Sequence, residues 1–277
     1  MKGAPQSARF ALLRTMTMKK RVMPYLSLVV FLYLGACAYL YATQRSKLYY
    51  PTPQIELAGI EKIALSSDGE TLRIWHIGPS DGDAILYFGG NAEDVSEVIP
   101  EFSKNFPHQS IYLVNYRGYG GSTGLPNEAG IFKDALAVYD FAQSRQRNSG
   151  DRSISIIGRS LGSGVAVYVE ANRKVKKMVL TTPYDSIENI AKKQFPMFPI
   201  SLLLKDKFAS DTRAAAISIP TLVILADADE VIPRANSEML IAAFRKSIPT
   251  TRIISNSSHN SILTSGVYWR DVSEFLH

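Results

Sequence analysis

The chain has 277 residues, of which 46% are hydrophobic and 20% charged, a balance typical of globular proteins and not of disordered ones. Its formal net charge of +6 comes from the start of the chain: residues 1–47 hold eight basic residues and no acidic one, and the remainder holds 23 basic and 25 acidic residues. The remainder therefore lacks the basic excess that nucleic-acid binding requires, and a single cysteine, Cys37, excludes an intrachain disulfide and a thiol metal cluster.

An apolar segment follows the basic start. Residues 22–44 contain no charged side chain, and a helix needs about 20 apolar residues to cross the hydrocarbon core of a bilayer. Tyr25, Tyr39 and Tyr41 lie near the ends of the segment, as expected for aromatic side chains at a membrane interface. The sequence therefore predicts a transmembrane helix or signal anchor over residues 22–44.

The charges that flank this segment predict its orientation. Lys19, Lys20 and Arg21 precede it, whereas Arg45 and Lys47 follow it. Because the more basic flank tends to stay inside the cell, we expect residues 1–21 in the cytoplasm and the main domain outside it, in the periplasm if the cell is Gram-negative.

Two alternatives to a membrane-spanning anchor stay open. Leu34-Gly35-Ala36-Cys37 resembles a lipoprotein signal, and a start at Met18 would give a leader of ordinary length that ends in a lipidated Cys37. The other alternative is a cleaved secretory signal or a simple core helix.

The rest of the chain alternates between short apolar runs and longer amphipathic ones. Residues 45–54 are expected to form a linker with extended backbone at Pro51 and Pro53, followed by a catalytic domain over residues 55–277. Strands are predicted at 60–65, 71–77, 84–88, 111–115, 153–157, 177–181, 221–225 and 251–254, and helices at 92–105, 128–145, 160–173, 186–193, 234–245 and 267–276. This alternation predicts an α/β fold with a mostly parallel sheet and helices on both faces, interrupted by a small cap over residues 184–216.

A candidate nucleophile lies in Gly158-Arg159-Ser160-Leu161-Gly162, a G-x-S-x-G motif between a predicted strand and a predicted helix. A serine on such a tight turn projects its hydroxyl at the carboxyl edge of the sheet, and the glycines allow the close approach of the backbone. The sequence therefore indicates Ser160 as the nucleophile of a hydrolase.

A serine hydroxyl needs a base to remove its proton. Of the four histidines, His259 lies in the loop after the last predicted strand, at the sheet edge where Ser160 is also expected. The imidazole in turn needs a carboxylate, and three acids follow the strand at 221–225. We predict Asp229 for this role, with Asp227 and Glu230 as alternatives.

The negative oxygen formed during acyl transfer needs hydrogen-bond donors, each contributing about 3 kcal/mol. The backbone N–H of Leu161 follows the nucleophile, and Gly89-Gly90-Asn91 follows the predicted strand at 84–88. We predict the N–H groups of Leu161 and Asn91 as these donors.

From about residue 46 onward the chain resembles the single-domain, membrane-anchored branch of the α/β-hydrolases, described as serine aminopeptidase-like and related to the abhydrolase-domain depalmitoylases. The motifs that carry the resemblance are Gln44-Arg45-Ser46 through Tyr50-Pro51, Gly90-Asn91-Ala92, Asn115-Tyr116-Arg117-Gly118-Tyr119-Gly120-Gly121-Ser122, Gly158 through Gly164, Asp229-Glu230-Val231-Ile232-Pro233 and His259-Asn260. The resemblance implies a Ser160–Asp229–His259 triad, an acyl-enzyme and no cofactor. The chain departs from the family at Gly89, where His is usual, at Ala226, where Gly is common, and at 256–258, where Asn-Ser-Ser replaces Gly-Ala-Gly.

The leading hypothesis is therefore a serine hydrolase of carboxyl-esters or thioesters, a monomer that acts on a small or lipid-like acyl ester at a membrane. An amide-cleaving peptidase and a non-catalytic membrane-tethered scaffold of the same fold are the alternatives. The histidines show no ligand spacing with Cys, Asp or Glu, so no metal site is expected.

Overall fold

The computed structural model describes residues 6–146 and 152–277, and the chain divides into two compact units, Met1–Gln44 and Arg45–His277. Helix α1 (Gln6–Leu48) makes up the first unit and ends in the second. Its stretch Met23–Leu48 is long and apolar enough to cross a membrane. At about 1.5 Å per residue these residues exceed the roughly 30 Å of a hydrocarbon core, so this helix could anchor the chain in a membrane.

Helix α1 runs further than the sequence predicts. We expected a linker from residue 45, but the residues up to Leu48 are helical. Arg45 and Lys47 lie in the last turn, where cationic side chains interact favourably with the helix dipole, and Pro51 disfavours helical backbone just before it. The Arg45 guanidinium also donates hydrogen bonds of 2.8 and 3.0 Å to the Asp206 carboxylate. The start of the predicted linker is thus a structured part of the second unit.

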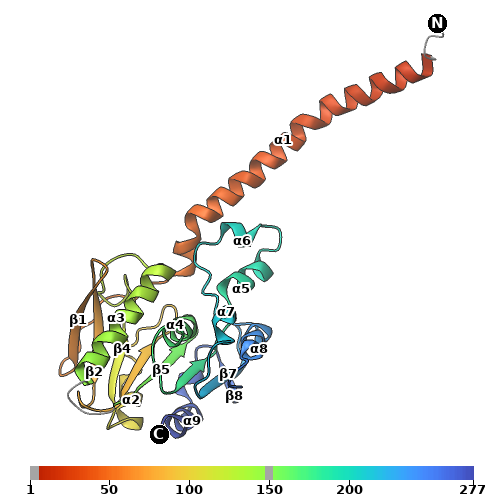
Figure 1. Ribbon diagram of the computed structural model, residues 1–277. Helices are drawn as coiled ribbons and strands as arrows, with labels where there is room; N and C mark the ends of the chain where they lie inside the picture. The colour runs from red at the N-terminus through yellow and green to blue at the C-terminus, as the bar shows by residue number, and fades with distance from the viewer. Residues whose placement is uncertain (1–5, 147–151) are drawn as a thin grey trace. The chain divides into compact units, whose positions relative to one another are not determined.

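The second unit is built on a sheet whose described strands follow the order β1-β2-β4-β3-β5-β6-β7-β8 (Figure 1). Strand β2 runs antiparallel to β1 and β4, and the other neighbours are parallel. The strands are β1 (Glu61–Ser67), β2 (Glu70–Ile77), β3 (Ala84–Phe88), β4 (Ser110–Val114), β5 (Ile154–Arg159), β6 (Met178–Thr181), β7 (Thr221–Ala228) and β8 (Thr250–Ser258). The predicted α/β fold with a mostly parallel sheet is confirmed.

Helices flank this sheet on both faces (Figure 1). They are α2 (Ile99–Asn105), α3 (Glu128–Gln146), α4 (Leu161–Glu170), α5 (Ile187–Gln194), α6 (Ile200–Leu203), α7 (Asp211–Ala214), α8 (Arg234–Ala243), the 3-10 turn η1 (Ile262–Thr264) and α9 (Gly266–Leu276). Every residue of the central strands β3 to β6 is buried, as their continuous apolar runs predict.

Successive residues of β3 belong to two different cores. Leu86 and Phe88 join a core that includes residues of α3 and α4, whereas Ile85 and Tyr87 join one that includes residues of α2 and α9. This division follows from the period of two in a β-strand, which sends neighbouring side chains to opposite faces. The carboxyl ends of β3, β5, β7 and β8 therefore meet at one edge of the sheet, where the predicted catalytic residues follow them.

Two predicted helical regions differ from the structure. The helix expected from residue 92 begins only at Ile99, because Pro100 at the start of the helix fits a first turn and not an interior position. The cap at 184–216 holds three short helices, α5 to α7, where one was predicted. Ile200 is buried, but Phe195, Met197 and Leu202 are 42%, 80% and 83% exposed. The cap therefore presents apolar side chains to its surroundings.

Candidate active site

Ser160 lies on a sharp turn between β5 and α4, as the G-x-S-x-G motif predicts. Its φ and ψ are 49° and −116°, a conformation that a residue with a side chain rarely adopts. Strain of this kind is held in place by the surrounding structure and is typical of functional sites. Only 8% of the residue is exposed, and the hydroxyl stands at the carboxyl edge of the sheet.

The two glycines of the motif are required by packing. A Cβ on Gly162 would lie 1.9 Å from the carbonyl oxygen of Phe88, and one on Gly158 would lie 2.4 Å from the carbonyl oxygen of Gly162. Both distances are far shorter than any real contact, and the obstructing atoms are backbone. The start of α4 can therefore sit against β5 and the end of β3 only because these positions lack side chains.

His259 reaches Ser160 from the loop after β8. Its Nε2 lies 2.9 Å from the Ser160 Oγ, a hydrogen-bond distance suited to proton transfer. The side chain of His259 is 5% exposed, so bulk water does not compete freely for this contact. The structure thus brings together two residues 99 positions apart in the chain.

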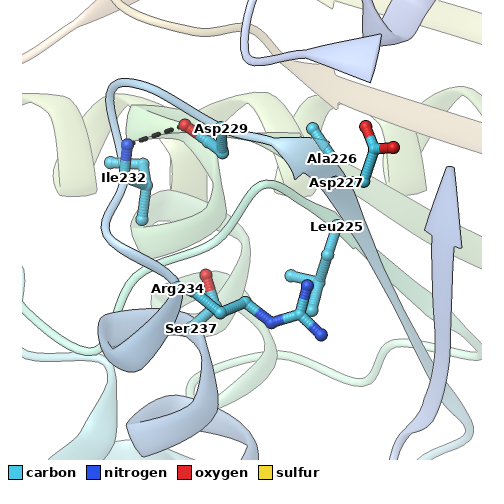
Figure 2. Close-up of a pocket in the computed structure, with 7 residues that line it drawn as sticks. All are labelled: Leu225, Ala226, Asp227, Asp229, Ile232, Arg234 and Ser237. Atoms are coloured by element: carbon cyan, nitrogen blue, oxygen red, sulfur yellow. Dashed lines mark hydrogen bonds between the residues drawn. The ribbon is translucent and has the colours of Figure 1, made fainter. Parts of the chain in front are cut away.

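Asp229 holds the other side of the imidazole. Both of its carboxylate oxygens lie 3.0 Å from the His259 Nδ1, and Oδ1 accepts hydrogen bonds from the N–H groups of Val231 (2.9 Å) and Ile232 (2.8 Å), the latter drawn in Figure 2. Burial alone would raise the pKa of Asp229, but these hydrogen bonds lower it below its ordinary value. The carboxylate is therefore ionised at neutral pH and can fix the imidazole tautomer.

The two competing acids accept hydrogen bonds from backbone N–H groups at the end of β8 and directly after it. Asp227 accepts hydrogen bonds from the N–H groups of Asn256 (2.8 Å) and Ser257 (2.9 Å), which lower its pKa. Glu230 accepts one from the N–H of His259 (3.2 Å). Figure 2 shows the Asp227 and Asp229 carboxylates on different sides of the end of β7. Of the three acids, Asp229 is thus the one whose carboxylate contacts the imidazole.

The predicted oxyanion donors lie on adjacent turns. Leu161 is the first residue of α4, where backbone N–H groups have no partner inside the helix. Asn91 lies in the loop after β3, and the close approach of Gly162 to the carbonyl oxygens of Phe88 and Gly89 brings this loop against the start of α4. The two turns that carry the predicted donors therefore lie against each other.

A buried ion pair that sequence reasoning missed connects the loops of the site. The Arg159 guanidinium lies 2.8 Å from Glu93 and donates a hydrogen bond of 2.9 Å to the carbonyl oxygen of His259. Glu93 accepts a hydrogen bond of 2.5 Å from the N–H of Gly90, so the pair ties the loop after β3 to the loop that carries the histidine. The sequence did hold one signal for this pair: Arg159 is a charged residue inside the G-x-S-x-G motif, where the backbone is expected to be buried. A buried charge requires a partner, so an acidic residue could have been expected nearby.

A second Ser–His–acid arrangement lies elsewhere in the sheet. His76 contacts Glu61 through Nδ1 (2.5 Å) and Ser110 through Nε2 (2.9 Å). Ser110, however, is fully buried and is the first residue of the parallel strand β4, at the opposite edge of the sheet from Ser160. Burial lowers the pKa of His76 despite the nearby carboxylate. This arrangement gives no access to a substrate and fits a structural role.

A small cavity of about 70 Å³ is lined in part by Asp229, and Figure 2 draws the residues around it. Its lining residues come from the end of β7 and the start of α8: Leu225, Ala226, Asp227, Asp229, Ile232, Arg234 and Ser237. Neither Ser160 nor His259 lines it, and its volume suits a few water molecules. Among the residues that the structure describes, no group of three His, Cys, Asp or Glu side chains could hold a metal ion.

Comparison with known proteins agrees with this fold. Residues 87–216 match the family model of the alpha/beta hydrolase fold. The chain is 31% identical over 240 residues to an uncharacterized protein of Mycobacterium tuberculosis, covering 82% of this chain and 85% of the relative. It is 36% identical over 142 residues to the lysophosphatidylserine lipase ABHD12 of Xenopus tropicalis, covering 44% of this chain and 36% of that lipase.

Among solved structures, the esterase Pf2001 of Pyrococcus furiosus superposes with a TM-score of 0.64 at 15% identity, covering 82% of this chain and 96% of the esterase. At this identity the likeness concerns the fold. Taken together with the family match over 87–216 and the mycobacterial relative, it shows that this chain belongs to the α/β-hydrolase family.

Proposed function

We propose that this hydrolase cleaves carboxyl-ester or thioester bonds through an acyl-enzyme, with Ser160 as nucleophile, His259 as base and Asp229 as its orienting acid. The observation that carries the proposal is the unbroken chain of contacts from Asp229 through His259 to the Ser160 hydroxyl, which stands on a strained strand-to-helix turn. A non-catalytic scaffold would have no need of this geometry.

The chemistry follows from these contacts. His259 Nε2 takes the proton of Ser160 as Oγ forms a bond to the carbonyl carbon, and the N–H groups of Leu161 and Asn91 stabilise the negative oxygen. The bond to the leaving group then breaks, the leaving group receives the proton from His259, and an acyl ester of Ser160 remains. A water molecule deprotonated by His259 attacks this ester, so that the acid is released and Ser160 is restored.

The exposed apolar residues of the cap support a lipid-like substrate. Phe195, Met197 and Leu202 are exposed, although apolar side chains of this size usually prefer burial. The cap is also tied by Asp206 to Arg45, at the end of the stretch that could span a membrane. The lipase relative acts, by its name, on lysophosphatidylserine. We therefore propose medium-length acyl substrates presented at or near a lipid surface.

This substrate class predicts how activity depends on acyl length. Along p-nitrophenyl esters of two to twelve carbons, kcat/KM should rise by about 4-fold per methylene, since a buried methylene contributes about 0.8 kcal/mol, until the binding groove ends. Leu202→Ser should reduce this rise. The matched control is Ile248→Ser, because Ile248 is 87% exposed but lies outside the cap. A steady fall from acetyl upward would contradict the proposal, and the matching thioester and amide series would rank the three bond types.

We further propose that the apolar part of α1 is a single-pass membrane anchor, with residues 1–21 in the cytoplasm and the catalytic domain outside it. The basic residues at 19–21 support this orientation. A reporter fused after His277 should be active only outside the cytoplasm, and should become cytoplasmic when residues 22–44 are deleted. A cytoplasmic signal from the full chain would refute the orientation. Retention of a Cys37→Ser variant in the membrane fraction would separate a helical anchor from a lipid one.

A further inference from the structure

The side chain of Asn91 binds the segment Leu48–Tyr50, which ends the long helix and follows it. Its Nδ2 donates a hydrogen bond of 2.6 Å to the carbonyl oxygen of Leu48, and its Oδ1 accepts one of 3.0 Å from the N–H of Tyr50. Tyr49, between these two residues, is 3% exposed. The amide of Asn91 thus joins the loop after β3 to a hydrogen-bonded segment that begins at Leu48, the last residue of the candidate membrane span, and whose middle residue is buried.

Tyr119 completes this connection. Its hydroxyl donates a hydrogen bond of 2.7 Å to Asn91 Oδ1 and accepts one of 2.9 Å from the N–H of Tyr50. The ring is 2% exposed and packs edge-on against Tyr116. A rigid, buried phenol therefore sets the distance between the segment Leu48–Tyr50 and the loop that carries Asn91.

The loop after β3 has a backbone that needs such restraints. Ala92 has a φ of 60°, in the left-handed region that side chains disfavour, and such conformations persist only where their surroundings enforce them. On the neighbouring residues, Tyr116 donates a hydrogen bond of 2.7 Å to the carbonyl oxygen of Gly89, and Glu93 accepts one from the N–H of Gly90. Asn91 itself is held by the hydrogen bonds of its side-chain amide. The direction of its backbone N–H therefore depends on these side-chain contacts.

We propose that Asn91 and Tyr119 are positioning residues, through which the segment Leu48–Tyr50 aims the backbone N–H of Asn91 at the developing oxyanion. This inference rests on the proposed function, because the direction of this donor matters only if Ser160 forms a tetrahedral intermediate. The end of helix α1 then contributes to the geometry of the oxyanion hole. Binding of the segment Leu48–Tyr50 by Asn91 and Tyr119 is coupled to stabilisation of the transition state.

The test uses the full chain in detergent or nanodiscs. Tyr119→Phe should lower kcat by about 10-fold and Asn91→Ala by about 100-fold, because loss of one oxyanion donor costs about 10²–10³ in kcat and a misdirected donor is lost in part. KM should change by less than about 2-fold. The affinity for an alkyl trifluoromethyl ketone, whose adduct with Ser160 carries an oxyanion, should fall by the same factors as kcat. The double variant should be no worse than Asn91→Ala, since both residues act through one connection.

The matched control is Tyr139→Phe. Like the Tyr119 hydroxyl, the Tyr139 hydroxyl donates a hydrogen bond to a carbonyl oxygen, here that of the Lys174 backbone. The residue is equally buried, but its hydroxyl does not contact the loop after β3. This variant should lose a similar amount of thermal stability and keep its kcat and its affinity for the ketone.

Each outcome decides between a positioning and a merely structural role. If Tyr119→Phe and Asn91→Ala lose stability as Tyr139→Phe does, and keep both kcat and ketone affinity, the inference is overturned while the proposed function stands. If the wild-type chain neither turns over esters nor reacts with a fluorophosphonate, the proposed function fails and the inference fails with it. A loss of kcat matched by the loss of ketone affinity, at constant KM, supports it.

Discussion

Ser160→Ala should lower the kcat for p-nitrophenyl esters by about four to six orders of magnitude, as loss of a triad nucleophile does, and should abolish labelling by a fluorophosphonate. Only the oxygen that attacks the carbonyl is removed. The fold should stay intact, because alanine is smaller than serine and carries the same Cβ at the strained φ of this position. Turnover, probe labelling and thermal unfolding of the two proteins measure these three expectations.

The chain offers a close control for this experiment. Ser110 is also buried and also lies 2.9 Å from a histidine Nε2, so Ser110→Ala removes the same atom from a similar contact. This variant should remain active and should still be labelled. If Ser160→Ala retained full turnover, the assignment of the nucleophile would be wrong, and equal loss in both variants would point to a general effect on folding.

Asp229→Asn should lower kcat by about 10⁴-fold, the effect of the same change in a serine triad. An amide at this position can donate a hydrogen bond to Nδ1, which favours the tautomer that carries its proton on Nε2 and cannot accept one from Ser160. It also removes the negative charge that stabilises the imidazolium. Because the pKa of Asp229 is lowered, the wild-type carboxylate is present throughout the neutral range, and the difference between the two proteins should persist across it.

Asp227→Asn is the natural comparison, since the two acids are two residues apart. Its side chain would still accept a hydrogen bond from the N–H of Asn256 or Ser257 at the end of β8, and kcat should fall by less than about 10-fold. Steady-state kinetics of both variants on one ester decide the matter. A reversed order of effects would move the orienting role to Asp227.

Much of the fold was predictable because its signals are local. The run Ala84–Phe88 is apolar at each position, and strand β3 has those same bounds, since a strand buried on both faces needs no alternation. The fold of the elbow was predictable for the same reason: Gly158 and Gly162 flank Ser160 within five residues. The predicted start of a helix at residue 92 was wrong, because the prediction gave more weight to the pattern of apolar residues than to Pro100. A proline at that position indicates the first turn of a helix.

Much of the site's environment was not predictable, because it depends on contacts between distant parts of the chain. Glu93 and Arg159 are 66 residues apart, and neither position alone indicates the other. Three acids lie within four residues at the end of β7 and directly after it, and the choice among them depends on the direction of each carboxylate, which spacing does not show. The link between Asn91 and Tyr50 is of the same kind, since a residue that reads as part of a linker proves to be hydrogen-bonded to the loop after β3.

The glycines beside Ser160 have a consequence for how this chain could change over generations. A side chain at Gly158 or Gly162 would collide with backbone atoms, so almost any substitution there destabilises the fold, whether or not the protein is catalytically active. Replacement of the serine costs only the reaction. A descendant that had lost hydrolase activity would thus still carry both glycines, on either side of a substituted residue 160. Among relatives of this chain, we therefore expect the two glycines to identify the fold, and the residue at position 160 to distinguish active hydrolases from inactive ones.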